Sequence, residues 1–362
     1  MAIDINQLLK LMIDKGASDL HLMVNTPPVL RINGELIDLE NYAPLDPIDI
    51  ETILNEITTP DQRELFFRNL ELDFAWSISG IARFRVNVLK QRGTLSLAIR
   101  LVPYRIPTID ELELPQICKD LILKPRGLIL VTGASGTGKS TTLAAMLNHL
   151  NQTERRNVIT IEDPIEYIFS NQKCLILQRD LGDDTLSFST ALLHALRHDP
   201  DVIVVGEMRD LDTISTALRA AETGHLVLGT LHTIDAPQSI DRIIDIFPYG
   251  QQRQVRLQLS QVIEAILSQR LLPRIGGGRI AAFEILLGTR AVAKLIREEK
   301  IFELNAHMET CRREGMQTMD QALAELVRRK TVCLEDALRY SSNPDRLRFH
   351  LAQSEPARTC SR

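Results

Sequence analysis

The sequence predicts a two-domain protein in which an α+β domain comes first and an α/β domain follows. In the first hundred residues, short segments of alternating apolar and polar residues, typical of half-buried strands, occur beside segments with helical spacing. From residue 127 onward, nearly continuous apolar runs alternate with helical segments, as in a sheet that helices cover on both faces. Between them, Pro103, Pro107 and Pro115 indicate a semi-rigid connector.

These boundaries divide the 362 residues into three parts. We predict an N-terminal domain over residues 1–105 and a C-terminal domain over residues 106–350. Residues 351–362 are polar and contain Pro356, so we expect a disordered tail there.

In the first domain, a helix is expected over Asn6–Lys15, where apolar residues recur with helical spacing and Gly16 follows. Two further helical stretches are expected within Pro47–Leu70, on either side of Pro60. Asn33-Gly34 predicts a tight hairpin turn. Strands are expected at Leu20–Met23, Val29–Ile32, Glu35–Leu39, Leu72–Trp76, Ala82–Leu89 and Thr94–Leu101.

In the second domain, five apolar runs are predicted as strands of a sheet buried on both faces. They are Gly127–Thr132, Asn157–Ile161, Leu175–Gln178, Val202–Val205 and His225–Leu231. Helices are expected between them over residues 140–150, 187–197 and 212–222. Beyond residue 251 the pattern is mostly helical, with one strand expected at Ile280–Leu287.

Composition excludes several classes of protein. The formal net charge of −5 argues against coating of nucleic acid. No apolar run reaches the 18 or so residues that span a bilayer, and the N-terminus lacks the pattern of a signal peptide. The five cysteines never form Cys-x-x-Cys, so neither a zinc ribbon nor a disulfide framework is expected. These features predict a cytosolic protein.

The most specific motif is Gly133-Ala-Ser-Gly-Thr-Gly-Lys-Ser140, which matches G-x-x-x-x-G-K-[ST] in full, between a predicted strand and a predicted helix. Glycines let backbone N–H groups surround phosphate oxygens, and the following helix points its positive end at the same anion. Lys139 would reach the β- and γ-phosphates, and Ser140 would hold Mg²⁺. The predicted nucleotide-binding residues are Gly133, Ala134, Ser135, Gly136, Thr137, Gly138, Lys139, Ser140 and Thr141.

Acidic residues end two of the predicted strands. Glu207 follows the strand at Val202–Val205, and Glu162 and Asp163 follow the strand at Asn157–Ile161. The carboxyl ends of strands in a doubly wound sheet are where ligands bind. Each acid on its own is equally compatible with a helix cap or a solvated turn, but a neighbouring phosphate loop favours a functional role.

The roles of two histidines and two arginines stay open at this point. His225 and His232 bracket one strand at opposite ends, so they are poor joint ligands for one metal. His232 lies at the carboxyl end of the predicted strand, where ligands bind, and could either sense a γ-phosphate or be structural.

Arg83 and Arg85 share one strand face, with Arg92 and Arg100 expected on neighbouring strands. The pattern alone favours a solvated sheet face over arginine fingers.

Taken together, these motifs resemble those of the type IV pilus retraction ATPases, the PilT/PilU family of secretion-type ATPases. The phosphate loop, Ile161–Tyr167, Val205–Asp210 and Thr223–Thr233 are similar to that family's Walker A, Asp, Walker B and His boxes. Further similar segments occur at Ala17–His21, Gly80–Asn87, Asp241–Pro248 and Gly315–Leu323. The resemblance extends over about residues 5–350.

The resemblance implies a PAS-like N-terminal domain, a RecA-like C-terminal domain, and a homo-hexamer that hydrolyses ATP with Mg²⁺. By the same resemblance, Glu207 activates water and His232 faces the γ-phosphate. Glu162 acts in catalysis too and, with Asp163 and Ser140, holds the metal.

Arg83 and Arg85 become arginine fingers through the resemblance and not through their spacing. The resemblance also implies a motor for pilus retraction, or disassembly, and twitching motility at the cytoplasmic face of the inner membrane. Its expected partners are a membrane platform protein, which provides the only membrane association, and a paralogous retraction ATPase, with no direct contact to nucleic acid.

The segment Ala291-Val-Ala-Lys-Leu-Ile-Arg-Glu298 departs from the PilT pattern Ala-Ile-Arg-Asn-Leu-Ile-Arg-Glu and predicts a somewhat closer likeness to PilU. Two alternatives therefore stand beside the motor. One is an accessory ATP-binding ring subunit that supports a companion motor, and the other is a nucleic-acid translocase, which the acidic balance disfavours.

Overall fold

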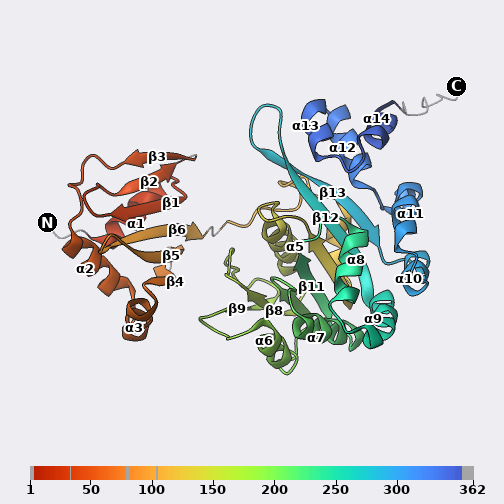
Figure 1. Cartoon of the computed structure of the whole chain (residues 1–362), viewed down its shortest axis with the longest axis horizontal. Helices are drawn as coiled ribbons and strands as arrows, with labels where there is room; N and C mark the ends of the chain where they lie inside the picture. The colour runs from red at the N-terminus through yellow and green to blue at the C-terminus, as the bar shows by residue number, and fades with distance from the viewer. Residues whose placement is uncertain (1–3, 33, 79–81, 103–104, 353–362) are drawn as a thin grey trace. The chain divides into compact units, whose positions relative to one another are not determined.

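The computed structural model describes residues 4–352 apart from residues 33, 79–81 and 103–104 (Figure 1). These residues fall into two compact units. One holds the residues up to Arg105 together with Glu166–Ile168, and the other holds the remainder. The first unit is α+β and the second is α/β, which confirms the predicted fold class.

The first unit is an antiparallel sheet with three helices. Its strands follow the order β3-β2-β1-β6-β5-β4. The elements are α1 (Ile5–Asp14), β1 (Asp19–Met23), β2 (Val29–Ile32), β3 (Glu35–Asp38), α2 (Pro47–Ile57), α3 (Pro60–Asn69), β4 (Glu71–Ile78), β5 (Ala82–Gln91) and β6 (Thr94–Val102). Thr59 caps α3 and Pro60 opens it, so the expected helical stretch divides at that proline. Ile32 pairs with Glu35 across the predicted hairpin, whose Asn33 lies outside the described residues.

Strand β5 buries every second side chain. Phe84 is fully buried, whereas Arg83 and Arg85 on the opposite face are half-buried. On the neighbouring strand β6, Arg100 pairs with Asp19 at 2.8 Å. The expectation that Arg92 also lies on a strand is wrong, because it forms the turn between β5 and β6 with a φ of +48°.

The second unit contains a seven-stranded sheet in the order β13-β12-β7-β11-β10-β8-β9. All neighbours are parallel except β12 and β13. Its strands are β7 (Gly127–Thr132), β8 (Asn157–Glu162), β9 (Leu175–Asp180), β10 (Val202–Val205), β11 (Leu226–Leu231), β12 (Ile263–Pro273) and β13 (Arg279–Leu287). The five strands predicted before residue 251 are confirmed, with β11 starting one residue after His225.

Helices cover both faces of this sheet, as the continuous apolar runs predict. In β7, Ile129 and Val131 pack toward α4 (Ile117–Ile122) and α5 (Lys139–Thr153). Leu128 and Leu130 pack toward the helices of the other face. Those helices are α6 (Phe188–Ala195), α7 (Leu211–Glu222), α8 (Ala236–Asp245), α9 (Tyr249–Val262), α10 (Arg290–Arg297) and α11 (Leu304–Thr310).

Strand β12 corrects the sequence interpretation, which assigned its residues to a mostly helical region. Ile263–Pro273 contains good helix formers, such as Ala265, Leu267 and Gln269, so local propensity does not indicate a strand. In the structure β12 pairs with β7 on one side and β13 on the other. The ladder of hydrogen bonds and burial on both faces override propensity there.

A separate apolar cluster joins the C-terminal helices α12 (Met319–Arg328), α13 (Leu334–Tyr340) and α14 (Pro344–Ala352) to β12 and β13. The three helices are labelled close to one another in Figure 1. Of the predicted tail over residues 351–362, the first two residues complete α14, and residues 353–362 lie outside the described part of the chain. Within the described residues, no helix combines the length and hydrophobicity needed to cross a bilayer.

Candidate functional site

The predicted phosphate loop connects β7 to α5 at the carboxyl edge of the sheet. Gly133, Gly136 and Gly138 adopt φ values of +147°, +76° and +91°, which side chains disfavour. The loop therefore needs glycine at these positions for its backbone path. The helix that follows, α5, is 15 residues long and begins directly after the loop. Its N-terminal N–H groups and the positive end of its dipole therefore face the loop.

Lys139 lies inside this loop. Its side chain is largely buried, and Nζ donates to the carbonyl oxygens of Gly133 at 2.8 Å and Ala134 at 3.0 Å. Ser140 and Thr141 follow in the first turn of α5 and are half-buried. One ammonium group and the N-terminus of a helix thus lie together at this loop, an arrangement that suits an anion.

Two predicted catalytic residues lie side by side at the ends of neighbouring strands. Glu207 follows β10 and His232 follows β11, and Glu207 Oε1 is 3.1 Å from His232 Nε2. Arg209 Nε also donates to Glu207 Oε1. Parallel pairing of Val205 with Gly229 brings the carboxyl ends of β10 and β11 together. Glu207 and His232, which are 25 positions apart in the sequence, therefore lie in one group of polar side chains.

The surroundings of Glu207 keep its carboxyl group ionised. Partial burial by itself would raise its pKa, but the hydrogen bond from Arg209 and the charges of His232 and Arg209 outweigh burial and hold the pKa below the ordinary value. A carboxylate that stays charged at neutral pH accepts hydrogen bonds from a bound molecule and is a weak proton acceptor.

The predicted acidic pair at the end of β8 lies next to this group. The N–H of Gly206 donates to the carbonyl of Ile161 at 2.7 Å, so the ends of β10 and β8 touch. A side chain at Gly206 would come within 3.1 Å of the Cα of Glu162, which explains the glycine there. Glu162 Oε1 accepts from Thr160 Oγ1 at 2.6 Å and from Gln178 Nε2 at 3.1 Å, and Asp163 follows it.

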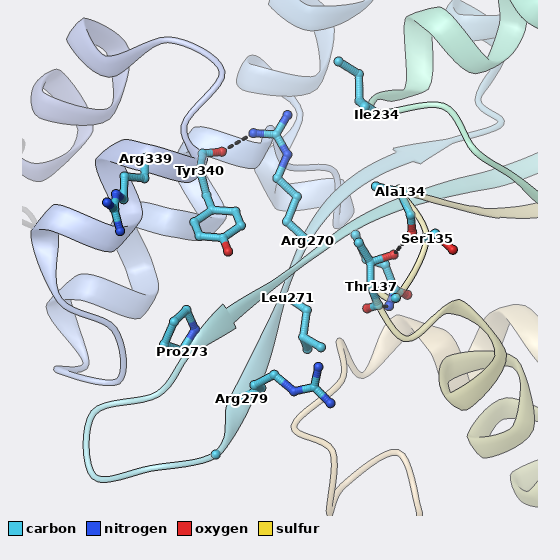
Figure 2. A pocket seen from close by; sticks show the side chains of 14 residues that line it. Ala134, Ser135, Thr137, Ile234, Arg270, Leu271, Pro273, Arg279, Arg339 and Tyr340 are labelled. Carbon is cyan, nitrogen blue, oxygen red and sulfur yellow. Dashed lines mark hydrogen bonds between the residues drawn. The ribbon is translucent and has the colours of Figure 1, made fainter. Parts of the chain in front are cut away.

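A cavity of about 570 Å³ lies on the other side of the phosphate loop (Figure 2). Its walls come from the loop, from Ile234, from β12 and the start of β13, and from the end of α13. Arg270 of β12 donates to the main-chain oxygen of Tyr340 and to Ser342 Oγ, which ties β12 to the chain at the end of α13.

Two residues of the candidate site had no role assigned from the sequence. Arg209 bonds Glu207, and its position within the quoted Walker B segment was the sequence signal that could have indicated it. Gln269 is 2% exposed and contacts the loop, but it lies on the strand that the sequence pattern concealed. His225, at the other end of β11, bonds Ala220 and Thr223 and has a local structural role.

Arg83 and Arg85 lie in the first unit, with the half-buried positions described above.

A dedicated metal cage is absent from the described residues, where no three His, Cys, Asp or Glu side chains converge. Mg²⁺ does not need such a cage, because it is commonly held by one or two carboxylates together with waters and substrate phosphates. The oxygen donors of Ser140, Glu162 and Asp163 fit that ion.

The sheet order, the phosphate loop and the acidic strand ends together define a P-loop ATPase with a RecA-like domain. A family model described as "Type II/IV secretion system protein" matches residues 69–277. The chain belongs to this family of secretion ATPases and, within it, to the PilT and PilU type.

Individual relatives support that placement. The type IV pilus retraction ATPase PilT of Pseudomonas aeruginosa is 45% identical over 342 residues, 94% of this chain and 99% of the relative. The type IV pilus ATPase PilU of the same organism is 42% identical over 347 residues, 96% of this chain and 91% of the relative. The prediction of a closer likeness to PilU is therefore not supported.

The solved structures agree with the sequence relatives. The crystal structure of the pilus retraction motor PilT with bound ADP has a TM-score of 0.90 and 46% identity, and covers 96% of this chain and 99% of that chain. The Legionella pneumophila ATPase DotB has a TM-score of 0.81 and 25% identity, and covers 92% of this chain and 93% of that chain.

Proposed function

We propose that this chain is the subunit of a homo-hexameric ATPase motor that powers type IV pilus retraction and twitching motility. The observation that carries the proposal is one sheet edge that holds a complete phosphate loop beside the Glu207–His232 pair. The names of the PilT and PilU relatives support the pilus as its load. We place the ring at the cytoplasmic face of the inner membrane, with a membrane platform protein and a paralogous retraction ATPase as partners.

Within this proposal, residues Gly133–Thr141 bind the phosphates of ATP. Backbone N–H groups and the ammonium of Lys139 neutralise the β- and γ-phosphates. Glu207 and His232 lie on the β11–β10 side of β7, so the γ-phosphate points there. The nucleoside then lies on the β12 side, in the cavity that Tyr340 and Arg270 line.

Ser140, Glu162 and Asp163 would hold Mg²⁺ together with phosphate oxygens and water. The ion supplies positive charge to the phosphate oxygens during cleavage. The hydrogen bonds from Thr160 and Gln178 orient the Glu162 carboxylate. These two hydrogen bonds hold one carboxylate oxygen in place, in the way that hydrogen bonds from surrounding residues orient metal ligands.

Glu207 orients the attacking water. Since its pKa is held below the ordinary value, Glu207 stays charged and accepts a hydrogen bond from that water. His232 lies 3.1 Å from the same carboxylate, so a contact of His232 with the γ-phosphate can change the position of Glu207. Arg83 and Arg85 act as arginine fingers within the ring, where their permanent charge offsets the charge that develops on the transferred phosphoryl group.

Phosphate release by the purified full chain tests this function. Glu207→Gln keeps the shape of the side chain and removes its charge, so we expect turnover to fall by about 10²–10³-fold while ATP still binds. Glu64→Gln, an exposed carboxylate paired with Arg68 on α3, is the matched control and should match the wild type. Equal phosphate release from the wild type and Glu207→Gln would refute the motor and favour an accessory ATP-binding subunit.

A further inference from the structure

Gln269 is a buried amide with both of its polar ends in use. Nε2 donates to the main-chain oxygen of Thr137 at 2.5 Å, within the phosphate loop. Oε1 accepts from Thr142 Oγ1 at 2.9 Å, on the first turns of α5. One side chain of β12 therefore bonds both the loop and the helix that follows it.

The glycines of the loop accommodate this contact. A Cβ at Gly133 would lie 2.5 Å from the main-chain oxygen of Gln269, and a Cβ at Gly138 would lie 3.3 Å from its Nε2. Close approach of β12 thus adds a second reason for glycine at both ends of the loop, besides the backbone angles. The fit makes the path of the loop depend on the position of Gln269.

The bond to Thr137 also sets the direction of a neighbouring N–H group. In a planar trans peptide the C=O and the following N–H point in opposite directions. Because Gln269 holds the carbonyl of Thr137, the N–H of Gly138 points away from Gln269. We propose that Gln269 is a positioning residue, which keeps this N–H aimed into the phosphate cradle. The proposal rests on the proposed function of the loop as the ATP site.

Variants that remove the donor test the role. Gln269→Glu keeps the size of the side chain and loses the N–H donor, and Gln269→Met removes both hydrogen bonds. Loss of one well-aimed hydrogen bond to a charged phosphate corresponds to a roughly 10- to 100-fold change in affinity. We expect the Kd for ATP and the KM to rise, and kcat/KM to fall, by about that factor in both variants. Gln317→Met is the matched control, because Gln317 also donates to a main-chain oxygen, that of Phe283, away from the loop.

The split between KM and kcat separates positioning from packing. A residue that only stabilises the fold lowers the fraction of active protein, which reduces apparent kcat and leaves KM and Kd unchanged. That result for folded Gln269→Glu and Gln269→Met would overturn the proposal. If neither variant folds, Thr142→Val replaces them, since it removes the donor that orients the amide, and we expect a smaller rise in Kd in the same direction. An unchanged Kd in folded Thr142→Val would also overturn the proposal.

The wild type, measured in parallel, distinguishes a failure of the proposed function from a failure of the positioning role of Gln269. A wild type that neither binds nor hydrolyses ATP overturns the proposed function and this inference with it. A wild type that turns over ATP beside Gln269 variants with equal Kd and KM overturns the positioning role alone.

Discussion

The phosphate loop lies between two sides of the sheet that use polar residues differently. On the β11–β10 side, Glu207, His232 and Arg209 form a partly exposed charged group. On the β12–β13 side, Gln269 and Glu284 are buried and bond to main-chain atoms. The first side has charges available to a bound molecule, whereas the second holds backbone in place.

Two glutamates show how strongly surroundings decide chemistry. The basic partners of Glu207 lower its pKa in spite of burial. Glu284 on β13 is 4% exposed and accepts the N–H of Ala236 at 2.8 Å. Burial raises the pKa of Glu284 to about 7, and the nearby charge of Asp235 acts in the same direction. The same residue type is thus a charged site group on one side and a structural acceptor on the other.

Removing charge from the loop itself should have the largest effect on ATP binding. In Lys139→Ala the ammonium that bonds Gly133 and Ala134 is lost, so we expect ATP to bind about 100-fold more weakly or worse. Titration with ATP measures this change. Lys90→Ala, an exposed lysine on β5, serves as the control. Unchanged affinity in Lys139→Ala would mean that the loop does not bind phosphate.

The second side predicts a dependence of stability on pH. Glu284 keeps its proton in the folded state up to about pH 7 but loses it near pH 4.5 when unfolded, so its contribution to stability falls as the pH rises between these values. The loss amounts to at most about 3 kcal/mol. Glu284→Gln keeps an oxygen for Ala236 and should flatten this slope in denaturant unfolding from pH 5 to pH 8.

Exposed Glu335 on α13 gives the matched variant, Glu335→Gln, which should follow the wild-type slope. Parallel slopes for the wild type and Glu284→Gln would show that burial does not control the Glu284 carboxyl group, and the contrast between the two sides would fail.

The smallest expected effect concerns the cavity. Tyr340→Ala removes a ring from the wall next to the proposed nucleoside and should weaken ATP binding by about 5- to 10-fold, the scale of one stacking contact. Binding of inorganic tripolyphosphate should not change, and Tyr340→Phe should keep wild-type affinity. Tyr249→Ala, at a residue of α9 that is 91% exposed, is the control. Equal loss of tripolyphosphate and ATP binding would place the cavity outside the nucleoside site.

Much of the fold could be predicted because its signals are local. Apolar runs such as Val202–Val205 and the proline at position 60 show their structure within a few residues. Strand β12 could not be predicted, since its helix-forming residues take a strand conformation only between β7 and β13. The placement of Arg92 on a strand was wrong for another reason: Arg92 lies between the predicted strands Ala82–Leu89 and Thr94–Leu101, and the structure makes it part of the turn that joins them, with a positive φ.

The sequence by itself determined the phosphate loop, the acidic strand ends and the likeness to retraction ATPases, because each is a contiguous motif whose spacing carries its chemistry. Only the tertiary structure decided which side chains meet. It brought Glu207 within 3.1 Å of His232, placed Gln269 against the loop, and gave two glutamates opposite pKa shifts. Hydrogen bonds, burial and charge depend on distances between residues far apart in the chain, and the folding of the sheet sets those distances.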